Sequence, residues 1–85
     1  MKIIKFSAVW CPACLVMKPI WKEINSMFPS LDIIDYDYDM DCDEVINYNI
    51  DNKLPVIIKL DDDGNEIGRL IGEKKKDEII KFIGE

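Results

Sequence analysis

Residues 6–14 read FSAVWCPAC, from Phe6 to Cys14, and hold two cysteines that are separated by two residues. The apolar run that precedes the cysteines, Ile3 to Val9, is too short for a helix and is typical of a buried parallel strand. Pro12 suits the first position of a helix, because the N–H that proline lacks is not needed there. The stretch therefore predicts a strand that leads directly into a helix, with Cys11 at the N-cap.

The spacing of Cys11 and Cys14 has a specific chemical use at the start of a helix. The free N–H groups of the first turn and the helix dipole stabilise a thiolate on Cys11, so we expect the pKa of its thiol to lie below the free value of about 8.5. Cys14 lies one turn further on, close enough to bridge back to Cys11. We expect Cys11, as the exposed sulfur, to attack the disulfide of a partner and Cys14 to resolve the mixed disulfide.

Periodicity and turn residues predict the other elements. The helical spacing that begins at Pro12 runs to about Phe28, and Pro19 inside it predicts a kinked or split helix. Beyond it we expect a strand at 31–39, a short helix at 41–48, a strand at 55–60, a turn at 61–65, a strand at 66–71 and a helix at 75–83. The order β-α-β-α-β-β-α indicates an α/β fold, a mixed four-stranded sheet with three helices. The first two strands are expected to be parallel and the last two to form an antiparallel hairpin.

Two of these segments allow more detailed expectations. Asp41 or Asp43 can cap the short helix, and Val45 and Ile46 are expected to face inward from it. Gly64 falls in the predicted hairpin turn, where a positive φ is needed and glycine adopts it without steric cost.

The composition indicates one domain over residues 1–85, because 48% hydrophobic residues suffice for a core and the length is too small for two domains. The net charge of -6 argues against nucleic-acid binding, which needs a surplus of Lys and Arg. The absence of histidine excludes histidine-dependent catalysis and imidazole-ligated zinc. No apolar run approaches the roughly 20 residues that cross a bilayer, and no signal peptide is visible, so we expect a cytoplasmic protein without membrane association. The odd thiol of Cys42 also suits a reducing compartment.

The chain resembles the thioredoxin family in several segments. Residues 6–14 are similar to the active-site segment of that family, and Pro19 lies where the family has its helix-kinking proline. Residues 53–56, Lys-Leu-Pro-Val, resemble its cis-proline loop, and Gly72 matches a glycine near its substrate groove. The resemblance begins at the central strand of the family and implies a minimal thioredoxin-like fold. It also implies a cis bond between Leu54 and Pro55.

The resemblance implies a thiol–disulfide oxidoreductase that reduces protein disulfides through the redox-active Cys11–Cys14 pair, with no other cofactor and no metal. Electrons would come from a thioredoxin-reductase-type flavoprotein or from glutathione, and the protein would be a monomer. The residues expected to bind substrate are Trp10, Pro12, Ala13, Leu54, Pro55 and Gly72. An apolar rim that a partner peptide could cover is expected from Val9, Trp10, Ala13, Leu54 and Val56.

The sequence departs from the family at two charged positions. Thioredoxins usually bury an aspartate in the strand before the cysteine motif and place a lysine near it on the neighbouring strand. Here the corresponding residues are Lys5 and Asp35, so the charges are exchanged. We expect a half-buried pair below Cys14, in which Lys5 favours a thiolate on Cys14 and Asp35 accepts its proton. The alternative is that both side chains only reach solvent from the sheet edge.

Three other functions stay open from the residues. A glutaredoxin-like enzyme recycled by glutathione could use the lysines at 74–76, although Trp10 and Ala13 favour a thioredoxin-type reductase. A thioredoxin-fold interaction module would keep its role without the cysteines. A metal or cluster shared across a dimer would use the single cysteine pair of each copy.

Overall fold

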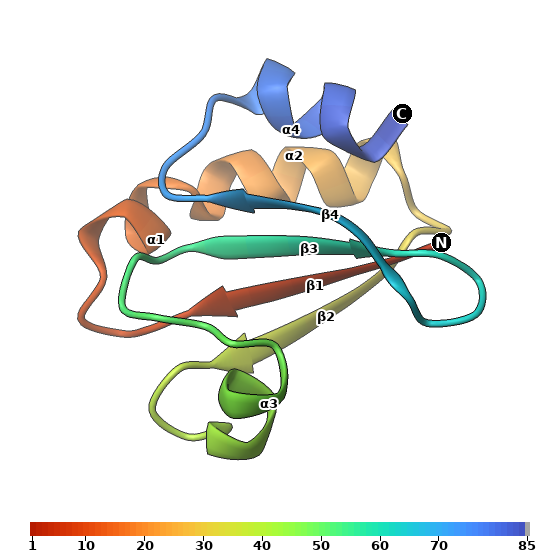
Figure 1. Ribbon diagram of the computed structural model, residues 1–85. Coiled ribbons are helices and arrows are strands. Elements are labelled where there is room, and N and C mark those ends of the chain that lie inside the picture. The colour runs from red at the N-terminus through yellow and green to blue at the C-terminus, as the bar shows by residue number, and fades with distance from the viewer. Residues whose placement is uncertain (85) are drawn as a thin grey trace.

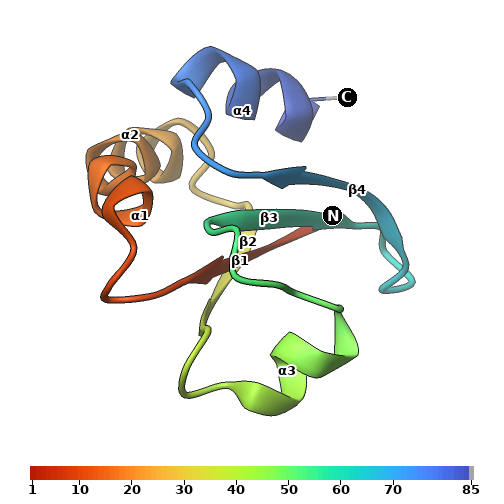
Figure 2. The same cartoon turned by 60° about the vertical axis from the view of Figure 1, so that its left-hand side comes forward.

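The computed structural model describes residues 1–84, which form one sheet of four strands with helices on both of its faces (Figures 1 and 2). The strands, in the spatial order β2-β1-β3-β4, are Lys2–Ser7 (β1), Asp32–Asp37 (β2), Val56–Leu60 (β3) and Glu66–Ile71 (β4). The helices are Pro12–Val16 (α1), Lys18–Met27 (α2), Cys42–Asn47 (α3) and Lys76–Gly84 (α4). Helices α2 and α4 cover one face of the sheet, and α3 covers the other.

The strand pairing agrees with the mixed sheet expected from the sequence. Strand β1 is parallel to β2 and antiparallel to β3, and β3 and β4 form the predicted antiparallel hairpin. The register places Lys5 of β1 directly beside Asp35 of β2. In the hairpin turn, Gly64 has a φ of 85°, as expected.

The helix predicted over residues 12–28 is split in two, one of the two outcomes expected from Pro19. Met17 ends α1 and also serves as the N-cap of α2, and its N–H still donates to Ala13 O. Pro19 lies in the first turn of α2, where its missing N–H costs no hydrogen bond. The split explains why the structure has one helix more than the three counted from the sequence.

Alternation along β1 divides the core into two clusters. Ile3 packs toward α2 and α4 with Met17, whereas Ile4 and Phe6 pack on the opposite face, the side of α3. All five residues of β3 are buried, because helices cover both faces of this strand. One of them is Lys59, which is 5% exposed and whose ammonium donates to the backbone oxygen of Phe82 at 3.0 Å.

Two expectations for the short helix were wrong. Ile46 is 70% exposed, because neighbouring positions of a helix point in different directions and Val45 occupies the side that packs on the core. Asp41 does lie at the N-cap of α3, but its carboxylate accepts the N–H of Asp37 at 2.7 Å instead of an N–H of the helix.

Among the described residues, no helix is both long and apolar enough to span a membrane. That residues 1–85 form a single domain stays a prediction.

Candidate active site

Cys11 is the N-cap of α1, as the sequence predicts. Its backbone is extended, with φ of -91° and ψ of 109°, and its Sγ accepts the N–H of Cys14 at 3.2 Å. The N–H of Cys14 thus reaches back across the first turn of α1 to the sulfur of Cys11. All three cysteines are free thiols in this structure.

The expectation that Cys11 presents an exposed sulfur was wrong. Cys11 is 4% exposed and Cys14 is 8% exposed, so neither thiol of the pair stands open to solvent. Cys11 belongs to a buried cluster with Ala8 and Leu54, and its N–H donates to the backbone oxygen of Ala8 at 3.2 Å.

Burial sets the protonation of Cys14. It is the largest of the effects that raise the pKa of the Cys14 thiol to about 11, and the hydrogen bond with the Cys11 side chain adds to it. Neither Lys5 nor Asp35 is among the causes of this shift. Cys14 is therefore a neutral thiol near neutral pH, and it must lose a proton before it can act as a nucleophile.

The cis-proline loop and the last strand meet beside the cysteines. The Leu54–Pro55 bond is cis, as the resemblance implied. The backbone oxygen of Pro55 accepts the N–H of Gly72 at 2.9 Å, and Gly72 has a φ of 89°, a conformation that favours glycine. Three of the residues expected to bind substrate are thus joined at one place, although Leu54 is 7% exposed.

Trp10 lies at the surface and is held by two neighbours on the segment after β2. Its Nε1 donates to Oδ2 of Asp39 at 2.8 Å, and its ring meets the Tyr38 ring edge to face at 5.9 Å. Half of Trp10 remains exposed. Sequence reasoning missed Asp39 as its partner, because a hydrogen bond across 29 residues leaves no local pattern.

The predicted apolar rim is only partly correct. Val9 is 81% exposed and Trp10 is 49% exposed, so both can meet a partner. Leu54 and Val56 are buried, because β3 and the loop before it lie in the interior. Pro12 is exposed and Ala13 half-buried, so the accessible apolar surface comes from residues 9–13.

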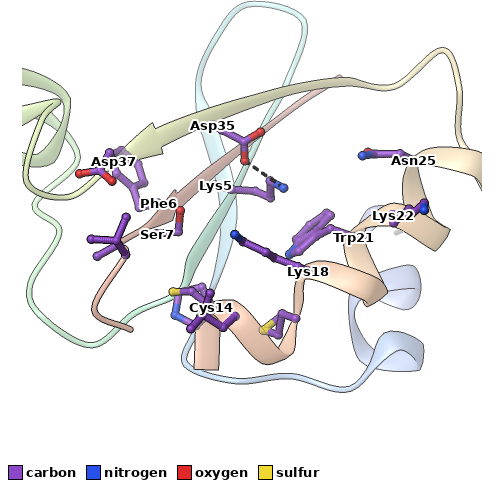
Figure 3. A pocket seen from close by; sticks show the side chains of 15 residues that line it. Lys5, Phe6, Ser7, Cys14, Lys18, Trp21, Lys22, Asn25, Asp35 and Asp37 are labelled. Carbon is purple, nitrogen blue, oxygen red and sulfur yellow. Dashed lines mark ion pairs between the residues drawn. The ribbon is translucent and has the colours of Figure 1, made fainter. Parts of the chain in front are cut away.

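A cavity of about 500 Å³ lies beside Cys14, between α2 and the strands β1 and β2 (Figure 3). Cys14 and Pro55 line it, and so do Lys5 and Asp35. The Lys5 ammonium is 2.9 Å from Asp35 Oδ1 and 4.4 Å from the centre of the Trp21 ring.

The exchanged charges therefore meet, but their burial is unequal. The Lys5 side chain is 14% exposed, whereas the Asp35 side chain is 67% exposed. Strand β1 is central and β2 is an edge strand, so the lysine stem is covered and the carboxylate reaches water. Water screens the ion pair of Lys5 and Asp35, and both residues line the same cavity as Cys14.

Sequence reasoning also missed three residues that α2 contributes to the cavity wall: Lys18, Lys22 and Asn25. Their spacing of four and three residues places them on one stripe of the helix, beside the buried Met17 and Trp21. That polar stripe was visible in the sequence, but only the fold shows that it faces a cavity. Residues 1–84 contain no group of three or more acidic or cysteine side chains that could hold a metal ion.

Comparisons with known proteins agree with this architecture. A family model for thioredoxin matches residues 1–85. A thioredoxin of Chlamydia trachomatis is 32% identical over 81 residues, which are 95% of this chain and 78% of the relative. Thioredoxin H2-1 of Oryza sativa is also 32% identical over 81 residues, 95% of this chain but 56% of the plant protein.

A solved structure shows the same fold. Oxidized mitochondrial thioredoxin 3 of Saccharomyces cerevisiae is similar with a TM-score of 0.86 and 26% identity, over 96% of this chain and 74% of the yeast chain. The chain therefore belongs to the thioredoxin family, has its α/β fold and is a thiol–disulfide oxidoreductase.

Proposed function

We propose that this thioredoxin-family protein reduces disulfides of other proteins, with Cys11 as the nucleophile and Cys14 as the resolving thiol. The observation that carries the assignment is the hydrogen bond from the Cys14 N–H to Cys11 Sγ at 3.2 Å. It supports negative charge on Cys11, whereas burial keeps Cys14 protonated until it is needed. Cys11 is therefore the thiol proposed to attack first, and Cys14 the thiol that attacks after it has lost its proton.

The reaction balances with two electrons and two protons. The Cys11 thiolate attacks one sulfur of the partner disulfide, a mixed disulfide forms, and the other partner sulfur leaves as a thiolate that takes up a proton. Cys14 then loses its proton, and its thiolate attacks the sulfur of Cys11. The mixed disulfide breaks, the second partner sulfur leaves and is protonated, and a Cys11–Cys14 disulfide remains.

The proton of Cys14 leaves into the cavity in this proposal. Asp35 is a carboxylate on the cavity wall and can take the proton through water. The Lys5 ammonium stabilises the negative charge that develops on the sulfur of Cys14. Both act at a distance from the sulfur, so they are positioning residues rather than groups that touch the reacting atoms.

Partner binding is proposed to use the side of Cys11. In this proposal the partner meets Pro55 and Gly72, which a backbone hydrogen bond joins, and the exposed Trp10 and Pro12 with the half-buried Ala13. We expect electrons to come from a thioredoxin-reductase-type flavoprotein or from glutathione, and the dithiol to need no bound cofactor. A monomer in a reducing compartment, the cytoplasm, fits the unpaired thiol of Cys42.

The decisive experiment compares three cysteine variants in the reduction of insulin disulfides with dithiothreitol as the electron source. Cys11→Ser should abolish the acceleration, and Cys14→Ser should accumulate a mixed disulfide with the substrate that mass spectrometry detects. Cys42→Ser is the matched control and should keep the full rate, because its thiol lies outside the motif and is exposed. A mixed disulfide that forms through Cys14 in the Cys11→Ser variant, at the wild-type rate, would reverse the two roles.

The electron donor requires a separate measurement. The reduction potential of the Cys11–Cys14 pair, followed by tryptophan fluorescence in dithiol and glutathione buffers, should lie near about -270 mV for a partner of a flavoprotein reductase. A value near about -200 mV would instead favour recycling by glutathione. Absence of a reversible two-electron transition would leave the interaction module as the function.

A further inference from the structure

We propose that the cavity beside Cys14 binds a small organic anion, with one carboxylate, sulfonate or phosphate group on an apolar body. The cavity, about 500 Å³ in volume, has the size of sites that hold small molecules, which range over roughly 300–1,000 Å³. It lies between α2 and the strands β1 and β2, and Cys14, not Cys11, is the cysteine of the motif that lines it (Figure 3).

The charge of the cavity opposes the charge of the chain. The whole protein carries a net charge of -6, yet Lys5, Lys18 and Lys22 line this one space. Lys5 is matched by Asp35 at 2.9 Å. Within residues 1–84, neither Lys18 nor Lys22 forms an ion pair, and Figure 3 shows Lys18 extending from α2 across the cavity. Two ammonium groups therefore remain for an anion.

The second carboxylate that lines the cavity, Asp37, is hydrogen-bonded to backbone N–H groups. Asp37 lines the cavity, but its Oδ1 accepts the N–H groups of Asp39 at 2.9 Å and Met40 at 3.1 Å. Those bonds fix its charge on the turn after β2, away from α2. Electrostatic preference for an anion near α2 thus persists although two aspartates line the space.

Apart from Ser7 and Asn25, apolar side chains supply the rest of the lining. Val9 and Leu15, which are 81% and 52% exposed, stand where the cavity meets solvent, and Met17 and Trp21 are buried deeper. An apolar body placed between these pairs would cover Val9 and Leu15, while its anionic group meets Lys18 and Lys22. A free inorganic ion would leave that apolar surface uncovered, so an organic anion is favoured.

The test uses two fluorescent probes that share one apolar body and differ by a single sulfonate group: 8-anilinonaphthalene-1-sulfonate and its uncharged analogue N-phenyl-1-naphthylamine. Binding is measured in the folded Cys11→Ser, Cys14→Ser variant, so that the result does not depend on the proposed thiol chemistry. We expect the sulfonate to bind at least about tenfold more tightly than the neutral probe. The double change Lys18→Met, Lys22→Met should remove that advantage and leave the affinity for the neutral probe unchanged.

Two controls locate the probe. Lys75→Met, Lys81→Met removes the same charge from exposed lysines outside the cavity and should leave both affinities unchanged. The chain has two tryptophans, so the indole N–H signal of Trp21, which lines the cavity, can be compared in the NMR spectrum with that of Trp10, which does not line it. The sulfonate probe should shift the Trp21 signal.

Three results would overturn the proposal: equal affinity for the two probes, equal losses in the Lys18/Lys22 and Lys75/Lys81 variants, or a shift confined to Trp10. Ser7→Leu provides an independent check, because Ser7 lines the cavity and a larger side chain there fills it. This variant should weaken both probes by about tenfold, and unchanged binding in it contradicts the location.

Discussion

The two cysteines of the motif share one buried cluster, but only Cys14 also lines the cavity beside α2. Cys11 lies among close-packed, uncharged neighbours, with Ala8 and Leu54 in its cluster. Cys14 lines a charged cavity with Lys5 and Asp35 on its wall. In the proposed function, the side of Cys11 meets the partner protein, and the cavity beside Cys14 takes up the proton that Cys14 loses.

The largest expected effect concerns the protonation of Cys14. In a Cys11→Ser, Cys42→Ser variant, burial still raises the pKa of Cys14, so its alkylation by iodoacetamide should accelerate about tenfold for each pH unit from about pH 7 to about pH 10. The sign follows from the acid: a raised pKa leaves the neutral thiol dominant until the pH approaches the pKa. Exposed Cys42, alkylated in a Cys11→Ser, Cys14→Ser variant, gives the reference rate for full access. A plateau of the Cys14 rate below about pH 9 would remove the difference between the two regions.

The second effect tests the backbone on the Cys11 side. Gly72→Ala should destabilise the fold by about 1–2 kcal/mol, because alanine at a φ of 89° is strained although open space surrounds its added carbon. Urea unfolding measures the change. Gly84→Ala is the control, because the added carbon also meets no neighbour and Gly84 has no positive φ. Its free energy of unfolding should stay within about 0.5 kcal/mol of that of the parent. Equal effects of the two changes would contradict a conformational cause.

The third effect tests the cavity side. Lys5→Met keeps the covered stem but removes the ammonium, and we expect the resolving step to slow by about threefold to tenfold, a modest loss because Asp35 is exposed and the pair is screened. Stopped-flow release of a second thiol from a mixed disulfide measures this step. Lys2→Met on the same strand is the control, since Lys2 lies outside the cavity, 4.0 Å from Asp32.

A resolving step that is unchanged in Lys5→Met would show that the exchanged pair has no part in the reaction. A pH profile adds a second readout, because loss of a positioning charge should move the apparent pKa of the step upward. Equal slowing in Lys2→Met would mean that general charge, not this cavity, is responsible.

The smallest effect concerns Trp10. Asp39→Asn keeps the shape but weakens the acceptor for the indole N–H, and its cost to stability should be at most about 1 kcal/mol because the bond is exposed. The Trp10 indole proton should exchange with solvent faster in this variant, as NMR detects. An unchanged exchange rate would indicate that the Tyr38 ring alone holds Trp10 in place.

Local patterns predicted the fold to a large extent. Cys11 followed directly by Pro12 predicted the start of α1. The alternation with a period of two from Ile33 onward predicted β2. What remained hidden depends on packing between distant segments. Burial of Cys11 arises from Leu54, which is far away in sequence, and the cavity arises where α2 and two strands fail to close completely. Neither is encoded in any run of neighbouring residues.

Lys59 on β3 is a buried lysine whose rate of acetylation depends on opening of the folded protein. Its ammonium lies on the backbone oxygen of Phe82 in α4, and the residue is 5% exposed, so an acetylating reagent cannot approach it while the sheet and α4 stay together. Other lysines, such as Lys22 and Lys75, stand exposed and will be modified quickly. The slow acetylation of Lys59 would therefore count openings of the folded state under native conditions, without denaturant. The acetylation rate of Lys59 on β3 therefore measures how often the interior of the protein opens, and Cys11 is buried in the same interior.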